Sequence, residues 1–390
     1  MTPKQRILKV INNQKPDRVP WSPLMGYNYI NAQNEQIRQL GIIRLWKKLK
    51  IDIVDRETVS AYGTKSKNVK VKTLVNGKQI NISEEEKTWQ AEVPLTMFLL
   101  YKYRDPSVKK IEKYFETPVG TLKSGYVNVP LSKTVFQNEY FIKTKDDIRV
   151  LKYMYENLEY IETYQEIKDK EKEIGDDGIV AAGAPGSPAI ELIEEYMGLE
   201  KFLMFLFDYP DEMKSLMGIM LQKNLEAYKI AAKSDVPLIV VWEDTGTGLY
   251  SPKIFNEYIA TALAAYTNIA HNCGKKIYVH SCGLLKDILD NLVATGIDGI
   301  MDMTPMPIGN IGFLEARERI GNKIVLTGGL DANVMTAKNK DLIEEKLSTL
   351  LAQMKPYGNF ILGSGDSVPA NTPIDNLEFI YDLVNKYGKY

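Results

Sequence analysis

The sequence predicts an α/β fold, a (β/α)8 TIM barrel with an antiparallel β-rich insertion between strands two and three. From about residue 178, short apolar segments alternate with helical segments, which is typical of a parallel sheet. Two more strand-like segments near the N-terminus raise the count to eight, the number in a TIM barrel. After the second of these segments and before residue 178, at about 56–145, hydrophobicity alternates around turn signals and predicts the insertion. We therefore expect one barrel domain over 1–390.

The N-terminal part is expected to supply the first two strands. Its segments are a helix at 3–13, a strand at 21–25, a helix at 33–49 and a short strand at 51–54. Pro16 and Pro20 favour extended backbone ahead of the first strand.

The insertion is read from turn chemistry and alternation. Asn76-Gly77 lies inside an alternating segment and predicts a β-hairpin. Further strand-like segments follow at 117–143, with one helix expected near 107–114 and another near 145–157.

The remaining six strands are expected in the C-terminal part. They lie at 178–183, 237–241, 276–280, 298–302, 323–327 and 359–363. Helical segments lie at 187–234, 252–271, 283–294, 311–319, 339–354 and 374–387. No GxGxxG or Walker loop follows any of these strands, which disfavours a nucleotide-binding fold.

Composition excludes several classes of protein. A formal net charge of −1 with evenly spread Lys and Arg predicts no nucleic-acid partner. No apolar run reaches 18 residues, so no membrane span is expected, and the first residues lack a signal peptide's apolar region. Two cysteines cannot form a disulfide framework, which favours a reducing, cytoplasmic location.

One histidine and one cysteine stand together at the end of the expected fifth strand. His280 and Cys282 are two residues apart, so they point to the same side of an extended chain. Imidazole and thiolate are usual ligands of zinc, although a structural His and a small buried Cys at the end of a strand would give the same sequence pattern. His271 and Cys273 precede the strand, at the opposite end of the barrel, and are interpreted as structural.

A catalytic zinc site requires a third protein ligand. Acids follow several expected strands, where TIM barrels place their catalytic groups. Asp366, Glu243 and Asp244 are the candidates, and Asp366 is preferred because it follows the last strand on a glycine-rich turn.

Several sequence blocks together resemble the uroporphyrinogen decarboxylase-like superfamily over nearly the full chain. The blocks are Pro16-Asp17-Arg18-Val19-Pro20, Glu243-Asp244, Ser251-Pro252, His280-Ser281-Cys282-Gly283, Gly328-Gly329-Leu330-Asp331 and Asn371-Thr372-Pro373. The superfamily contains metal-free decarboxylases and zinc-dependent methyltransferases that act with a corrinoid protein. The decarboxylases carry arginine in the loop after strand one, whereas the loop here, Met25-Gly26-Tyr27-Asn28-Tyr29-Ile30-Asn31, has none. A substrate rich in carboxylates needs cationic partners, so the methyltransferase branch is favoured.

The resemblance implies a zinc-dependent methyltransferase with ligands His280, Cys282 and Asp366, the last at the position of a family cysteine. It would move a methyl group between a small methyl ether, amine or thiol and the corrinoid (cobalamin) of a separate protein. Glu243 and Asp244 are expected to orient a ligand, replace one or donate a proton, as catalytic residues. The residues expected to bind substrate are Tyr27, Asn28, Trp242 and Asp331. Uroporphyrinogen decarboxylase and a non-catalytic ligand-binding barrel remain the alternatives.

Overall fold

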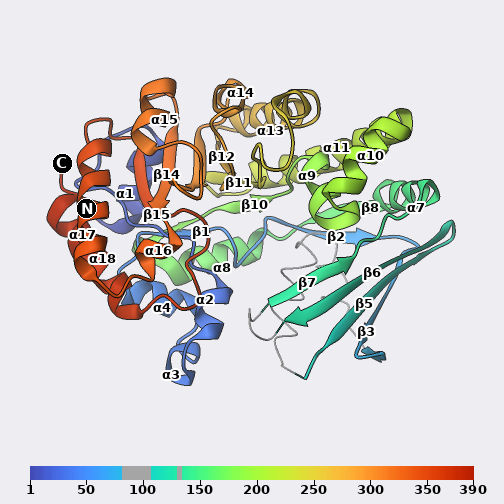
Figure 1. The fold of residues 1–390 in the computed structure, drawn as a ribbon, viewed down its shortest axis with the longest axis horizontal. Helices are drawn as coiled ribbons and strands as arrows, with labels where there is room; N and C mark the ends of the chain where they lie inside the picture. The colour runs from blue at the N-terminus through green and yellow to red at the C-terminus, as the bar shows by residue number, and fades with distance from the viewer. Residues whose placement is uncertain (81–106, 130–133) are drawn as a thin grey trace. The chain divides into compact units, whose positions relative to one another are not determined.

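The computed structural model describes residues 1–80, 107–129 and 134–390, and the chain divides into two compact units (Figure 1). The first unit comprises Met1–Ala61, Tyr164–Ala184 and Ala231–Tyr390, and the second comprises Tyr62–Thr163 and Pro185–Ile230. The second unit thus begins later than the insertion expected at 56–145. It also takes in 185–230, which the sequence analysis assigned to helices of the barrel.

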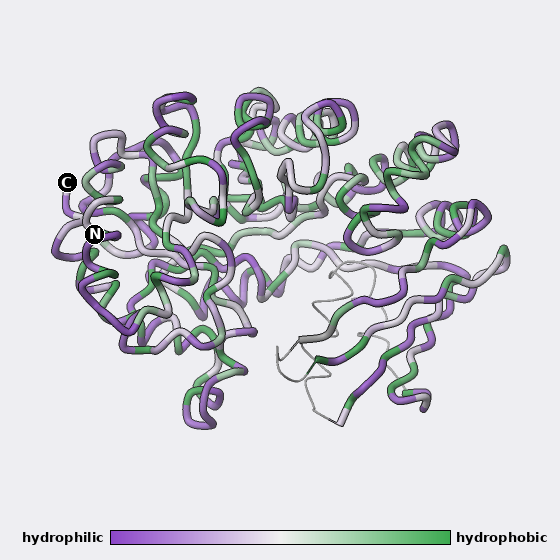
Figure 2. The backbone as a smooth tube through the Cα atoms, in the orientation of Figure 1, coloured by the Kyte–Doolittle hydropathy of each residue, from purple (hydrophilic) through white to green (hydrophobic). Residues whose placement is uncertain are grey.

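Parallel strands form the centre of the first unit and confirm the α/β class. Six lie side by side in chain order, namely β10 (Ala182–Ala184), β11 (Leu238–Trp242), β12 (Lys276–His280), β13 (Gly299–Met303), β14 (Val325–Leu330) and β15 (Phe360–Ser364). A separate parallel pair joins β1 (Ile53–Asp55) to β9 (Gly178–Val180). Their residues are almost all buried, as strands covered on both faces require, and Figure 2 shows much of this region in the hydrophobic colour.

The strand expected at 21–25 is reduced to isolated bridges. Trp21 pairs with Leu362 of β15, and the Asp52 amide donates to the Trp21 carbonyl at 2.8 Å. The segment is therefore bonded to β15 on one side and to the residue before β1 on the other. Pro20 and Pro23 lack the N–H groups that a continuous ladder needs, which explains why no full strand forms.

The core of the first unit lies among alternate residues of the parallel strands. Leu238, Tyr278, Val325 and Ile361 pack with apolar residues of helix α1 (Pro3–Ile11). The other helices of this unit are α2 (Tyr27–Ala32), α3 (Glu35–Arg38), α4 (Ile42–Lys48), α8 (Tyr164–Ile174), η1 (Gly175–Asp177), α12 (Pro252–Ile254), η3 (Phe255–Ile259), α13 (Ala260–Asn272), α14 (Leu289–Ala294), α15 (Phe313–Ile320), α16 (Ala332–Met335), α17 (Lys340–Met354) and α18 (Ile374–Tyr387). The α14 helix begins six residues later than the segment expected from 283, so the chain after Cys282 is a loop.

The second unit contains an antiparallel sheet in the order β4-β3-β5-β6-β7. The strands of the unit are β2 (Tyr62–Ser66), β3 (Lys70–Val75), β4 (Lys78–Ile80), β5 (Lys110–Thr117), β6 (Gly120–Val129), β7 (Thr134–Glu139) and β8 (Leu158–Glu162). Its helices are α7 (Lys145–Glu156), α9 (Pro188–Glu191), η2 (Leu192–Met197), α10 (Leu199–Asp208) and the long α11 (Pro210–Lys233), whose last residues belong to the first unit. β2 pairs with β8.

Two expectations for this unit have opposite outcomes. The Asn76-Gly77 hairpin is confirmed, because Val75 faces Lys78 and both turn residues have positive φ, as a type I′ turn requires. The helix expected near 107–114 is wrong, since β5 occupies most of that range. Buried Ile111, Lys113 and Phe115 alternate there at strand spacing, although lysine and glutamate by themselves favour a helix.

Candidate metal centre and active site

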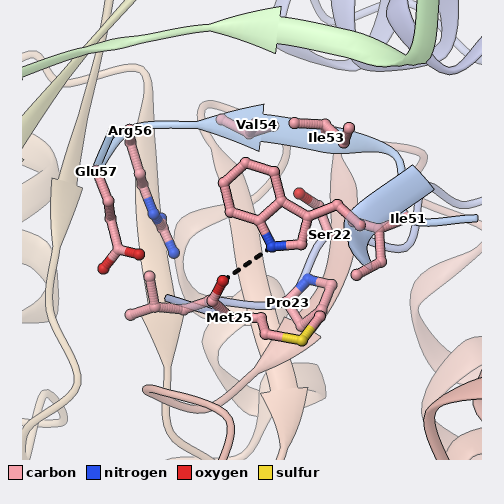
Figure 3. Close-up of a pocket in the computed structure, with 10 residues that line it drawn as sticks. Ser22, Pro23, Met25, Ile51, Ile53, Val54, Arg56 and Glu57 are labelled. Carbon is pink, nitrogen blue, oxygen red and sulfur yellow. Dashed lines mark hydrogen bonds between the residues drawn. The ribbon is translucent and has the colours of Figure 1, made fainter. Parts of the chain in front are cut away.

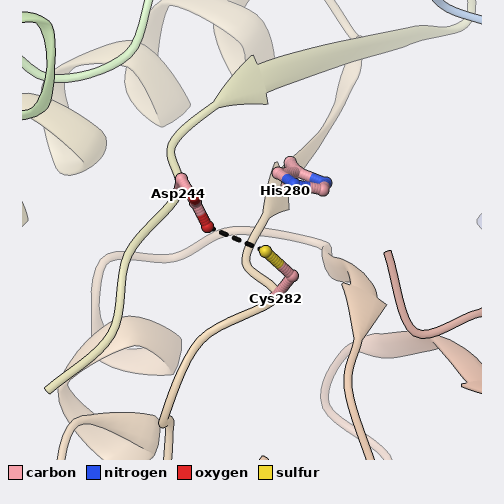
Figure 4. Close-up of side chains that lie close together, drawn as sticks. All are labelled: Asp244, His280 and Cys282. Atoms are coloured by element: carbon pink, nitrogen blue, oxygen red, sulfur yellow. Dashed lines mark hydrogen bonds between the residues drawn. The ribbon is translucent and has the colours of Figure 1, made fainter. Parts of the chain in front are cut away.

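Neighbouring strands β11 and β12 bring the central side chains together. Trp242, the last residue of β11, lies opposite His280, the last residue of β12. Asp244 and Cys282 each follow two residues later, so both turns leave the sheet at the same edge. Figure 4 shows the side chains of Asp244, His280 and Cys282 near one another where these strands end.

These three residues form a group that fits a metal ion. Their ligand atoms all lie within 4.8 Å of one another. The Cys282 thiol donates to Asp244 Oδ1 at 2.8 Å. His280 is buried, while the other two are half-buried and remain accessible. A nitrogen, a sulfur and a carboxylate oxygen are a donor set that zinc accepts.

The electrostatics of Cys282 also favour a bound cation. Burial raises the pKa of its thiol well above the usual range, and the charges of Asp244 and Asp366 raise it further. A thiolate in this position therefore needs a positive charge beside it. A divalent cation between Cys282 and Asp244 would meet that need, because coordination deprotonates a thiol.

His280 is held from its other side by a buried ion pair. Its Nδ1 lies 2.7 Å from Asp302 Oδ2. Arg56 donates from Nη2 to the second oxygen, Asp302 Oδ1, at 2.8 Å. Asp302 is 1% exposed and Arg56 5% exposed, so the pair is closed off from water. The sequence analysis assigned no role to either residue.

The pKa values within this chain of contacts follow from charge pairing. Burial opposes protonation of His280, but its hydrogen bond to Asp302 and the charge of that carboxylate outweigh it, and the pKa of His280 is raised. Burial also opposes ionisation of Asp302. The charge of Arg56 and the contact with His280 prevail there and lower the pKa of Asp302. Asp302 is thus held as a carboxylate.

Two acids at this edge adopt backbone conformations that are costly for residues with a side chain. Asp302 has φ +60° and Asp366 has φ +133°. Such strain, of order 1–3 kcal/mol, is found mainly where function requires a particular side-chain direction. The Asp302 amide donates to Thr327 Oγ1 at 3.0 Å, which helps to hold its conformation.

Trp242 packs beside the group as one wall. The centroid of its ring lies 5.5 Å from that of His280, and the Arg56 guanidinium lies 5.9 Å from the centroid of the Trp242 ring. Gly183 makes this position available, since a Cβ there would come within 2.7 Å of the indole Nε1. Trp242 was expected to bind substrate, and that role stays a prediction.

Glu57 is a further acid in this region that the sequence analysis did not identify. It lines a cavity of about 10 Å³ with Arg56 and Met25, as Figure 3 shows. Burial raises the pKa of Glu57 to about 7, and the nearby carboxylates of Asp55 and Asp302 add to the shift. Nothing in the local sequence distinguishes Glu57 from other glutamates, because its neighbours are distant in the chain: a Cβ at Gly26, for example, would lie 2.3 Å from Glu57 Oε2.

The remaining expected site residues are placed less directly. Asp366 is not part of the group within 4.8 Å, although its charge acts on both His280 and Cys282. Glu243 is fully buried beside Asp244. Asp331 accepts from the Asn333 and Val334 amides and caps α16. The two loop residues Tyr27 and Asn28 begin α2. Ligand or substrate roles for these five residues stay predictions.

Parallel strands in an α/β unit, with His, Cys and Asp at their carboxyl ends, define a TIM-barrel-type protein with a candidate metal centre. Comparison with known families is consistent with that class. The family model described as uroporphyrinogen decarboxylase (URO-D) matches residues 127–387, which is more than half of the chain. The chain belongs to the uroporphyrinogen decarboxylase family.

Individual relatives are distant. Uroporphyrinogen decarboxylase from Rickettsia bellii is 24% identical over 255 residues, covering 63% of this chain and 71% of that protein. The enzyme from Aliivibrio salmonicida is 22% identical over 218 residues, covering 53% of this chain and 58% of its own length. The chain thus spans little more than half the length of the latter relative.

A solved structure resembles the whole chain in fold. It is a methyltransferase from Methanosarcina mazei, with a TM-score of 0.55, 13% sequence identity and 99% of each chain covered. At that identity the likeness shows the fold alone. No helix in the described part of the chain is both long and apolar enough to cross a membrane.

Proposed function

We propose that this chain is a zinc-dependent methyltransferase built on a closed eight-stranded barrel. It would move a methyl group between a small methylated substrate, a methyl ether, amine or thiol, and the corrinoid of a separate protein. The observation that carries the proposal is the convergence of Asp244, His280 and Cys282 within 4.8 Å. The full-length fold likeness to a methyltransferase supports it.

The chain's own residues would prepare the site. Asp244 accepts the thiol hydrogen of Cys282 at 2.8 Å and offers a carboxylate oxygen beside the sulfur. Bound there, zinc would supply Lewis acidity to the atom that loses or gains the methyl group. Trp242 would form one wall of the site, with its ring centroid 5.5 Å from that of His280. Glu243 and Asp366 remain the candidates for an added ligand or proton donor.

Metal analysis tests this function. Purified protein should contain about one zinc per chain, as a single site requires. The Cys282→Ala variant should lose the metal and methyl transfer to a corrinoid protein, whereas Cys273→Ala, on the exposed second cysteine, should keep both. Methyl transfer by metal-free protein would contradict the proposal.

Uroporphyrinogen decarboxylase is the second candidate, because the curated relatives from Rickettsia and Aliivibrio carry that name. Incubation with uroporphyrinogen without added metal would then release coproporphyrinogen. The methyltransferase proposal expects no such turnover. Formation of coproporphyrinogen at the same rate by the Cys282→Ala variant would favour the decarboxylase.

A further inference from the structure

We propose that Asp302 and Arg56 act as a positioning pair that decides which ring nitrogen of His280 is presented to a metal. The inference rests on the proposed function, because it concerns the zinc site. Arg56 follows β1 and Asp302 lies near the end of β13, whereas the candidate metal ligands come from the ends of β11 and β12.

The contact with His280 carries the first step. Asp302 Oδ2 lies 2.7 Å from Nδ1, and a carboxylate can only accept a hydrogen bond. The proton of a neutral His280 ring is therefore held on Nδ1, and the lone pair is left on Nε2. A carboxylate behind the ring also makes the imidazole a stronger ligand.

Arg56 carries the second step. Its Nη2 binds Asp302 Oδ1 at 2.8 Å, and its Nη1 lies 2.9 Å from Met301 Sδ. The guanidinium occupies the Asp302 oxygen that does not face His280. Asp302 thereby stays behind the ring as an acceptor and is not itself free to become a metal ligand.

The backbone carries the third step. Asp302 has φ +60°, in the left-handed region, and its amide is bound by Thr327 Oγ1. This conformation at the end of β13 accompanies a side chain that reaches His280 on the neighbouring strand β12. A register shift between β13 and β14 falls at the same place, between Ile300 and Met303.

The chain contains a matched control for the pair. His271 Nε2 lies 2.8 Å from Asp298 Oδ2, a second histidine–carboxylate contact. His271 lies near the C-terminal end of α13 and Asp298 directly precedes β13, so the contact is at the opposite end of the strands from Cys282, and the His271 side chain is 43% exposed. Removing Asp298 therefore tests the loss of such a contact without touching the candidate metal centre.

Zinc affinity is the first measurement, made by competition with a chelating dye on the full chain. Asp302→Ala should weaken zinc binding by roughly 10–100-fold, the usual cost of losing an outer carboxylate partner. Asp302→Asn, whose amide oxygen still accepts but carries no charge, should give a smaller loss. Asp298→Ala should stay within twofold of wild type. Wild-type zinc affinity in folded Asp302→Ala would overturn the inference.

Asp302→Ala leaves the buried Arg56 charge unpaired and could fail to fold. The double variant Arg56→Met/Asp302→Ala removes that charge as well. It should show the same loss of zinc affinity, with thermal unfolding as the check on folding. A folded double variant with wild-type affinity would also overturn the inference.

Imidazole nitrogen NMR separates this inference from the proposed function. The chain has two histidines, so each ring can be assigned by removing one. In metal-free wild type at alkaline pH, His280 should carry its proton on Nδ1, and in Asp302→Ala that preference should be lost. A wild type that binds no zinc but shows this tautomer change would contradict the proposed function and support the positioning pair. If wild type binds zinc but the His280 tautomer is the same in Asp302→Ala, the proposed function is supported and the positioning pair is contradicted.

Discussion

At the scale of single residues, the third metal ligand is the sharpest question. The structure groups Asp244 with His280 and Cys282, whereas Asp366 acts on them through its charge. Asp244→Asn should therefore reduce zinc affinity by roughly tenfold or more, since an amide is a poorer ligand than a carboxylate. Asp366→Asn, the matched control, should change it less. A larger loss from Asp366→Asn in the same dye competition would restore Asp366 as the ligand.

Glu57 gives a pH dependence at the same scale. Its pKa of about 7 lies above that of an exposed glutamate, so the folded protein binds an extra proton between about pH 4.5 and 7. Stability should fall as pH rises through that window. Glu57→Gln should remove this slope and be the more stable protein at pH 8, with the difference fading near pH 4.5. Urea unfolding over this range measures it, with the exposed Glu318→Gln as control, and parallel curves for Glu57→Gln and wild type would contradict the assignment.

At the scale of elements, the close approach of β10 to the end of β11 can be tested at Gly183. A Cβ there would lie 2.7 Å from the Trp242 indole, so Gly183→Ala must displace the ring. We expect a loss of about 1–3 kcal/mol in unfolding free energy, the cost of overpacking, together with changed tryptophan fluorescence. Gly218→Ala, in the interior of α11 with open space around its Cα, should instead gain up to about 1 kcal/mol. Equal effects of the two substitutions would contradict this account.

The same scale shows what the sequence could predict. Regular alternation of apolar strands with helices located the last five expected strands to within a few residues, because burial on both faces leaves a strong signal. The strand expected at 178–183 is divided into β9 and β10, which belong to different sheets. The segment at 21–25 forms only isolated bridges, because its prolines cannot donate the hydrogen bonds of a continuous strand. The prediction of a helix at 107–114 was wrong, since the lysines and glutamates of β5 favour a helix although the segment is a strand. The spacing of His280 and Cys282 was enough to predict that these two side chains lie close together. The sequence could not indicate which acid lies nearest to them, because that depends on the register that places Trp242 opposite His280.

Arg56 and Asp302 show the same limit at longer range. They lie 246 positions apart in the chain, and no local pattern marks either one. Their pairing follows from strand order and from the positive φ of Asp302, which only the fold determines.

At the scale of the whole molecule, one buried carboxylate holds the N-terminal part of the first unit in place. Asp52 is fully buried and accepts hydrogen bonds from Arg6, from Arg18 and from the Trp21 amide. It thus joins α1, the segment at 21–25 and the start of β1. Asp52→Asn would leave the buried Arg18 without its charge partner and Arg6 with Asp17 alone, and should cost about 3–5 kcal/mol.

Chemical denaturation of the full chain measures this effect. Asp177→Asn, which removes a half-exposed partner of Lys47, is the control and should change stability by less than about 0.5 kcal/mol. A loss under 1 kcal/mol for Asp52→Asn would show that the three elements are held mainly by their apolar contacts.

The raised pKa of Cys282 also sets the chemical reactivity of the two cysteines. A thiol is alkylated and oxidised through its thiolate, so burial beside Asp244 makes Cys282 a slow nucleophile despite its partial accessibility. Cys273, by contrast, is exposed and can be reached by reagents. In the metal-free protein, alkylating reagents and peroxide should therefore modify the surface cysteine first and spare the thiol at the candidate metal centre.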